Sequence, residues 1–320
     1  MSDRTITAEA QEEQTKRRSA IATFFVRLVR EKPLGLLGAA ITLTLLLTGI
    51  FADFIAPYGM NETDTGAFLL APSAEHLLGT DNLGRDVLSR VIHGARISVI
   101  VGLSASVIST SVTVLIGLVS GYLGGAVDLV IQRLVDAVMS LPGLILLMVL
   151  MAILGTGMVQ IIVVIGLMVG IRGSRIIRGA VLDVKENAYV GAARAIGCST
   201  PRILFRHILP NIMAPAIILF TIRVPGAIML EASLSFLGLG IPAPVPSWGG
   251  MIGGQGRNYM FLAPWMGLWP GVALATVVYG VNVFGDAVRD LLDPKLRGGA
   301  GRYNAPTKRS KPEPKKKEVA

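Results

Sequence analysis

Four long stretches of this 320-residue chain contain no aspartate, glutamate, lysine or arginine. A membrane-spanning helix needs about 20 predominantly apolar residues, and each stretch is long enough to supply one. Strands of an outer-membrane barrel would alternate polar and apolar residues, and these stretches do not alternate. The sequence therefore predicts an all-α polytopic membrane protein. The uncharged stretches are residues 33–52, 97–127, 137–171 and 258–285.

The uncharged stretches predict six transmembrane helices. The third stretch is too long for one helix and contains Gly155-Thr156-Gly157, so we expect a tight turn there between two spans. A fifth span is expected between the third and fourth stretches, where a long apolar segment carries two charged residues. The expected spans cover residues 33–56, 97–127, 129–154, 158–178, 211–236 and 264–288.

The basic residues gather in three segments, 4–32, 172–206 and 289–317, which hold 7, 7 and 10 of the 30 lysines and arginines. Even numbers of expected spans separate these segments, so all three lie on one side of the membrane. Cytoplasmic loops of membrane proteins carry an excess of lysine and arginine. Both termini are therefore predicted to be cytoplasmic. Membrane topology explains the net charge of +9, which gives no reason to expect a nucleic-acid partner.

Outside the spans, residues 16–32 place five apolar residues on one helical face with basic residues around it. This pattern is typical of a helix that lies in the membrane interface and contacts lipid. Along the whole chain we expect a cytoplasmic N-terminal segment over 1–32, a first span over 33–56, an external segment over 57–93, a core with five spans over 94–290, and a basic, disordered cytoplasmic tail over 291–320.

A polar, basic interruption separates the fourth and fifth expected spans, with the sequence YVGAARAIGCSTPRILFRHILPN over 189–211. Acidic residues followed by four alanines predict a helix from Asp183 to Ile196, because alanine is the best helix former and acids favour a first turn. Gly197 stands where a left-handed glycine commonly ends a helix.

A second helix is expected to begin at Ser199 or Thr200, which suit an N-cap, with Pro201 in its first turn. It would run toward Pro210, where the fifth span begins. We call residues 183–210 the elbow. An ordinary loop would need only a few residues, so two capped helices with small side chains favour a docking surface on the cytoplasmic face.

The elbow resembles a cytoplasmic signature of the permease subunits of ATP-binding-cassette importers. That signature runs Glu-Ala-Ala, three residues, Gly, nine residues, Ile-x-Leu-Pro. Here Gly191-Ala192-Ala193, Gly197 and His207-Ile208-Leu209-Pro210 occupy its positions, so Gly191 departs from the glutamate and His207 from the isoleucine. The dipeptide, oligopeptide and nickel group is similar over residues 30–297. The matching segments include LGTDNLGRDVLSR (78–90), GARIS (94–98), EASLSFLGLG (231–240), PSWG (246–249) and FGDAVRDLLDP (284–294).

This resemblance implies the type I importer permease fold in a prokaryotic inner or plasma membrane, and half of a translocation pathway for peptides or similar small solutes. It also implies four kinds of partner or ligand: a second homologous permease subunit, two cytoplasmic ATPase subunits, an extracytoplasmic solute-binding protein, and ATP with magnesium on the ATPase subunits. The chain itself has no GxxxxGK[ST] motif, so we expect no cofactor and no catalytic residue on it. The elbow residues expected to contact an ATPase subunit are Glu186, Gly191, Ala192, Ala193, Arg194, Gly197, Pro201, Leu209 and Pro210.

Arg223 and Glu231 are charged residues within the fifth expected span and are candidates for the translocation pathway. A charge inside a membrane is costly, so Arg223 would face a cavity or a partner. That partner is either a peptide carboxylate or a group on the second permease subunit. The histidines lie on both sides of the membrane and predict no metal site. An ion-coupled secondary transporter that uses these two charges is the alternative, but it would not need the elbow.

Overall fold

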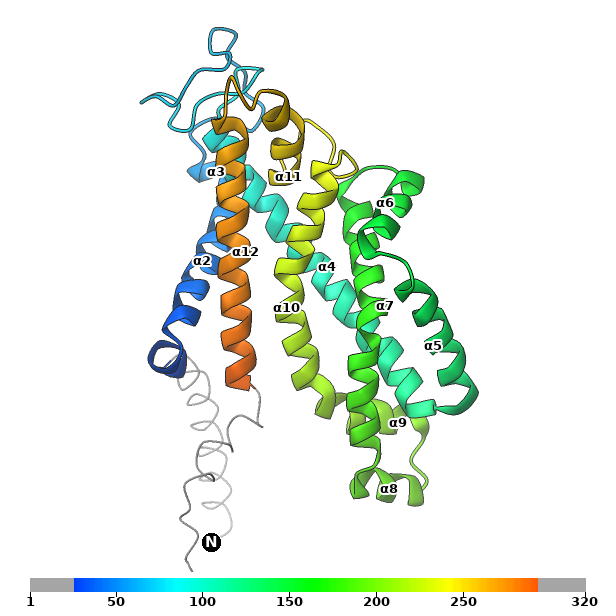
Figure 1. Ribbon diagram of the computed structural model, residues 1–320. Helices are drawn as coiled ribbons and strands as arrows, with labels where there is room; N and C mark the ends of the chain where they lie inside the picture. Colours follow the sequence, from blue (N-terminus) through cyan, green and yellow to red (C-terminus); the bar gives the residue numbers. More distant parts are fainter. Residues whose placement is uncertain (1–25, 293–320) are drawn as a thin grey trace, which may run out of the picture.

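The computed structural model describes residues 26–292, and its regular elements in this range are all helical (Figure 1). Most of the amphipathic segment expected over 16–32, and nearly all of the tail expected over 291–320, lie outside the described residues. We call the end of the molecule that carries α8 (Ala188–Ala195) and α9 (Thr200–Ile203) the inner end. The opposite end, with α3 (Ala52–Ile55) and α11 (Trp248–Met251), is the outer end.

Five helices in the described range are long and apolar enough to cross a membrane, and a bent pair brings the number to six. The expected six spans are therefore confirmed in number. The five are α2 (Pro33–Ile50), α4 (Val87–Leu123), α7 (Met158–Lys185), α10 (Leu209–Phe236) with the helical turns before it, and α12 (Trp265–Leu292), and the bent pair is α5 (Gly125–Met139) with α6 (Gly143–Leu154).

The third span is not the continuous helix that we expected over 129–154. The axes of α5 and α6 meet at 90°, and the break falls at Ser140-Leu141-Pro142. Proline has no N–H to donate and disfavours helical geometry in the residue before it, so the chain turns here. The turn expected at Gly155-Thr156-Gly157 is present, with Gly155 at a φ of 85°.

The second and fourth spans are longer than the sequence suggested. Helix α4 begins at Val87, well before residue 97, because the Asp86 side chain caps it by accepting a hydrogen bond from the Ser89 N–H at 2.7 Å. It ends at Gly124, whose φ of 66° suits glycine. Helix α7 continues past residue 178 to Lys185.

Helix α4 crosses the bundle obliquely and makes its most extensive contact with α7 (Figure 1). Glycines allow this close approach. A Cβ atom on Gly117 of α4 would lie 2.8 Å from the Cβ of Ile177, and one on Gly170 of α7 would lie 2.7 Å from the Cβ of Val112. Small residues at such contacts let two backbones pack closely within a membrane. Helices α2 and α12 pair in the same way beside α4, where Gly38 meets the backbone of Gly280.

We predict that Gly170→Ala lowers the thermal unfolding midpoint of the purified complex. The added methyl group forces α4 and α7 apart, and such overpacking costs about 1–3 kcal/mol. Gly179→Ala on the same helix is the matched control, because a Cβ there meets nothing within 4 Å. Alanine is the better helix former, so the control should keep or raise the midpoint. Equal midpoints for the two variants would contradict the close contact.

Candidate functional site

The elbow helix α8 ends at Gly197 in a Schellman motif. The Gly197 N–H donates to the Arg194 carbonyl at 2.9 Å, and the Cys198 N–H donates to the Ala193 carbonyl at 3.0 Å. Gly197 has a φ of 78°, a conformation that residues with side chains rarely adopt. The glycine stop expected from the sequence is therefore confirmed.

The first elbow helix begins later than expected, at Ala188 and not at Asp183. Asp183 belongs to α7, and Glu186 caps the C-terminal end of that helix. The Asn187 side chain causes the break, because its Nδ2 donates to the Val184 carbonyl at 3.0 Å and to the Asp183 carbonyl at 3.4 Å. These carbonyls are among the last of α7, which have no partner within the helix. The acids therefore end α7 and do not begin α8.

The second elbow helix is not a separate element. Helix α9 follows Ser199, passes through a π-helical turn over Leu204–Ile208 and continues into α10 without a break. Pro210 has no N–H for the usual bond one turn back, and the ladder adjusts locally by widening. The inner end of α10 is thus part of the elbow, so a displacement of the elbow is passed directly into a membrane-spanning helix.

One face of α8 is buried and the other is exposed. Val190 is fully buried and Ala193 is 5% exposed, in a cluster with Ile203 and Ile208. Ala193 therefore faces the protein, which contradicts its expected place on the contact surface. The remaining side of α8 is open, and a Cβ on Gly191 would meet nothing within 4 Å. Of the residues expected to contact an ATPase subunit, Leu209 is half-buried and those exposed are Glu186, Gly191, Ala192, Arg194, Gly197, Pro201 and Pro210. Three large apolar side chains of the elbow, Tyr189, Ile196 and Phe205, are exposed as well.

Tyr122, at the inner end of α4, attaches the elbow to the rest of the molecule. The Arg194 guanidinium lies 5.2 Å from the centre of its ring, and the Lys185 Nζ lies 5.6 Å from the same centre. Lys185 Nζ also donates to the Tyr122 carbonyl at 2.8 Å. Cations within about 6 Å of an aromatic face are attracted to it. Tyr122 thus holds the end of α7 and helix α8 to α4.

A polar cluster joins the neighbouring inner ends of α4, α5 and α7. Arg178 binds Asp128 through both carboxylate oxygens, with the Nε–Oδ1 distance at 2.7 Å. The Ser120 hydroxyl donates to the same carboxylate, and Gln132 donates to Ser120 at 2.9 Å. A bidentate arginine–carboxylate pair fixes orientation as well as distance. The inner ends of these three helices are therefore held together as a unit.

Arg223 lines a small cavity of about 170 Å³ between α4, α7 and α10. Two serine hydroxyls from α4, those of Ser106 and Ser109, line the same cavity and are buried. Among the described residues, none of Arg223 Nη1, Ser106 Oγ and Ser109 Oγ has a hydrogen-bond partner. Buried polar groups are nearly always satisfied by protein, water or a ligand. Three unpartnered polar atoms thus belong to residues that line an otherwise apolar cavity inside the membrane-spanning region.

Glu231 lies apart from this cavity, nearer the outer end of α10. It is 1% exposed, and its Oε1 accepts a hydrogen bond from the Ser235 hydroxyl at 2.7 Å. Within residues 26–292 no hydrogen bond or ion pair joins it to Arg223. The two charges proposed for the pathway therefore belong to different sites.

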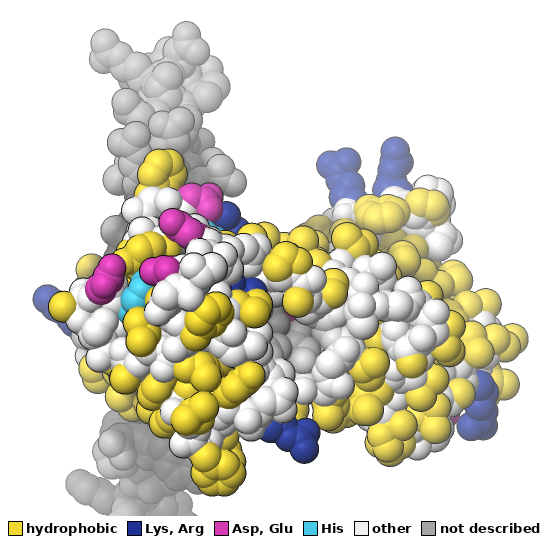
Figure 2. Space-filling view, turned by 90° about the horizontal axis from the view of Figure 1, so that it is seen from above, with side chains coloured by type: hydrophobic (Ala, Val, Ile, Leu, Met, Phe, Trp, Pro, Cys, Tyr) yellow, Lys and Arg dark blue, Asp and Glu magenta, His cyan; other side chains and the backbone are white. Residues whose placement is uncertain are grey.

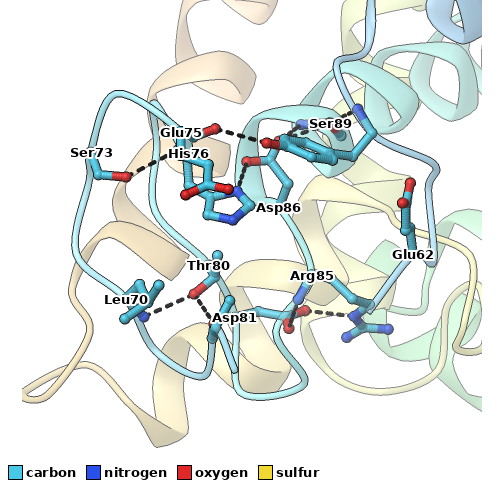
Figure 3. A network of polar contacts seen from close by, with 12 residues as sticks. Glu62, Leu70, Ser73, Glu75, His76, Thr80, Asp81, Arg85, Asp86 and Ser89 are labelled. Atoms are coloured by element: carbon cyan, nitrogen blue, oxygen red, sulfur yellow. Dashed lines mark hydrogen bonds and ion pairs between the residues drawn. The ribbon is translucent and has the colours of Figure 1, made fainter. Parts of the chain in front are cut away.

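The outer segment before α4 contains a buried polar network (Figure 3). His76 Nδ1 lies 3.0 Å from Asp86 Oδ1, and the other oxygen of Asp86 accepts the bond that caps α4. Asp81 Oδ2 accepts from Arg85 Nε at 2.7 Å. From the sequence, LGTDNLGRDVLSR carried only a resemblance. The four-residue spacing between Asp81 and Arg85 in this segment was the signal in the sequence that could have indicated the network.

At the edge of this network, Asp53 joins α3 to α4. Arg96 Nη2 donates to Asp53 Oδ2 at 2.8 Å, and this hydrogen bond holds the pKa of the Asp53 carboxyl below its usual range. His93 Nε2 lies 3.3 Å from the same carboxylate. In the described part of the chain, no group of three or more His, Cys, Asp or Glu side chains is placed to hold a metal ion.

Two family models match the chain. The inner membrane component of binding-protein-dependent transport systems matches residues 113–298, and the N-terminal transmembrane domain of oligopeptide transport permease C matches residues 23–72. A chain of a methionine ABC transporter crystallised in an inward-facing conformation has the same fold, with a TM-score of 0.51. That likeness covers 64% of this chain and 96% of the other at 17% identity.

Curated relatives are similar over most of their length. An oligopeptide transport system permease protein of Bacillus subtilis strain 168 is 39% identical, over 84% of this chain and 88% of that protein. A di/tripeptide transport system permease protein of Pseudomonas aeruginosa is 40% identical, over 82% of this chain and 88% of that protein. A glutathione transport system permease protein of Pectobacterium atrosepticum is 36% identical, over 80% and 85%.

We predict that Tyr122→Leu loosens the elbow while leaving the bundle folded. Leucine keeps the apolar contacts but removes the ring that attracts Arg194 and Lys185. Each such contact contributes about 0.5–1 kcal/mol at an exposed site, so amide hydrogen exchange in α8 should accelerate about two- to fivefold. Tyr279→Leu on α12 is the control and should leave exchange in α8 unchanged. Unaltered exchange in Tyr122→Leu would show that the ring does not hold the elbow.

Proposed function

We propose that this chain, which belongs to the family of inner membrane components of binding-protein-dependent transport systems, forms one half of a translocation pathway for peptides. The peptide substrate is supported by the relatives, which are named as oligopeptide and di/tripeptide permeases and match over more than four-fifths of this chain. A second homologous permease subunit would form the other half. The broad apolar faces of the membrane-spanning helices suit such a partner and the surrounding lipid.

The energy source would be ATP, bound with magnesium on two separate cytoplasmic ATPase subunits. A solute-binding protein would deliver the peptide at the outer end. The family description includes binding-protein dependence, which supports this last partner. The absence of a GxxxxGK[ST] motif in the sequence is the reason to place ATP on other subunits.

The observation that carries this proposal is the shape of the elbow. Its exposed surface includes the small residues Gly191 and Ala192 next to the 80% exposed side chain of Ile196, and Tyr189 and Phe205 are exposed elsewhere on the elbow. Another protein can therefore approach the backbone of α8 closely at Gly191 and Ala192. The elbow is attached to α4 through the contact between Arg194 and Tyr122, and its C-terminal part continues directly into α10. An ATPase subunit bound to the exposed face of the elbow would therefore move both α4 and α10 when it closes around nucleotide. Coupling requires an element of this kind that both sites can bias.

The cavity at Arg223 is proposed to lie on the translocation pathway. A guanidinium with an unsatisfied Nη1 and two serine hydroxyls without partners suits the passage of a polar solute across a low-dielectric region. Glu231 is proposed to shape the outer part of the same route through Ser235, which it orients.

The elbow proposal is tested by disulfide crosslinking to an ATPase subunit in a Cys198→Ser background, since Cys198 is the only cysteine. We expect Ala192→Cys to crosslink to a cysteine placed in the ATPase groove, because Ala192 is exposed. Ala193→Cys is the matched control and should not crosslink, because its side chain is buried. An intact complex in which Ala192→Cys repeatedly fails to crosslink would contradict docking at this face.

Peptide uptake by the reconstituted assembly tests the role of Arg223. We expect Arg223→Gln to lower uptake about tenfold or more, the effect of losing a hydrogen bond to a charged group, while ATPase subunits still bind. Arg133→Gln, which removes a side chain that is 75% exposed on α5, is the control and should transport normally. Uptake that persists without any ATPase subunit would contradict the whole proposal and favour an ion-coupled transporter.

A further inference from the structure

A cavity of about 520 Å³ opens on the outer end of the molecule, between the end of α10, the loop over 238–247, and α11 with the π-helical turn that follows it. Figure 2 looks onto this end, where the surface is hollowed toward its middle and acidic side chains lie over one side. The cavity lining contains three arginines and no aspartate or glutamate. Those arginines are Arg85, Arg90 and Arg257.

The positive charge at this cavity exceeds the negative charge nearby. Arg85 and Arg90 are each 6% exposed and share a single carboxylate, that of Asp81, at Nε–Oδ2 distances of 2.7 and 3.7 Å. The other bonds of Arg90 go to neutral groups, the Met60 carbonyl and the Asn61 amide oxygen. Buried charges are normally paired, so one guanidinium here lacks its counter-ion.

Glu231 does not change this balance. Its carboxylate lies behind Ser235, which lines the cavity, and Glu231 itself does not line it. If the Glu231 carboxyl is counted as charged, the three guanidiniums still have only two carboxylates nearby, those of Asp81 and Glu231. The surrounding protein therefore leaves an excess positive charge at the wall of an open cavity.

Arg257 is available for a ligand. It follows the π-helical turn and is exposed, and it makes no hydrogen bond or ion pair with another described residue. Arg85, by contrast, is held in position, since its Nη2 donates to Gln255 Oε1 at 3.2 Å. The cavity thus combines two arginines fixed by the fold with a third that is free to close on a bound group.

This arrangement suits a carboxylate on a small molecule. The planar guanidinium donates two parallel hydrogen bonds to a carboxylate, which a single ammonium group does not match. The volume lies within the range of about 300–1,000 Å³ that is typical of small-molecule sites. The cavity also lies at the outer end, where a solute leaving a binding protein would enter. Apolar side chains and glycines form most of the remaining lining, which leaves room for varied side chains.

We propose that this outer arginine cavity receives the terminal carboxylate of the incoming peptide, before the peptide passes between the permease subunits. The inference rests on the proposed function, because it names the group of the substrate that the outer end recognises. It predicts that the permease itself, and not only the binding protein, distinguishes a free carboxylate from its neutral amide.

The test uses the full assembly in proteoliposomes with its binding protein. Uptake is measured for a radiolabelled dipeptide and for its C-terminal amide, chosen so that the binding protein holds both equally well. We expect Arg257→Gln to lower uptake of the free-carboxylate dipeptide about three- to tenfold and to leave that of the amide unchanged. Arg257→Lys should restore part of the difference. The preference for the carboxylate should also weaken as ionic strength rises.

Asn258→Ala is the matched control, because Asn258 is the exposed neighbour of Arg257 and does not line the cavity. It should keep the wild-type preference. Equal losses of both peptides in Arg257→Gln would overturn the inference. The inference would also be overturned if the loss of uptake in Arg257→Gln matched a weaker affinity of the loaded binding protein for the permease. Arg257 would then bind a carboxylate of the binding protein and not that of the peptide. If the wild-type assembly imports neither peptide, the proposed function fails and this inference falls with it.

Discussion

The glycine contact between α4 and α7 is the constraint on which the other features of this molecule depend. Without side chains at Gly117 and Gly170 the two helices pack backbone to backbone, which fixes the path of α4 through the bundle. Helix α4 has 37 residues, or about 55 Å at 1.5 Å per residue. It is long enough to connect the outer network, the cavity at Arg223 and the elbow.

Each of these places uses a different part of α4. Its first residues lie in the outer network, where Asp86 caps the helix and Arg90 lines the arginine cavity. Its middle contributes Ser106 and Ser109 to the cavity at Arg223. Its last turn holds Tyr122, which binds the elbow through two cations. A displacement of the elbow therefore acts on a helix that also forms part of both cavities, and α10 makes a second connection of the same kind.

Much of the membrane architecture was predictable, because the bilayer leaves few choices. Backbone groups in hydrocarbon must be satisfied within the helix, so uncharged stretches of sufficient length indicate spans directly. The Gly197 stop was predictable for a similar reason, since it depends on local backbone geometry. The bend before Gly143 was missed although Pro142 signalled it, because the apolar pattern continues through the break. The start of α8 was also missed, because the Asn187 cap competes with an alanine-rich pattern that favours helix on both sides.

The sequence by itself determined the class of protein, the number of spans and the point where α8 ends. These properties follow from hydrophobicity, charge distribution and local backbone preference, which act over short stretches of chain. Only the tertiary structure decided that Ala193 faces inward, that Arg223 lines one cavity with two unpartnered serines, and that three arginines share another cavity. Those facts depend on residues far apart in the sequence, such as Arg85 and Arg257, and packing alone brings them together.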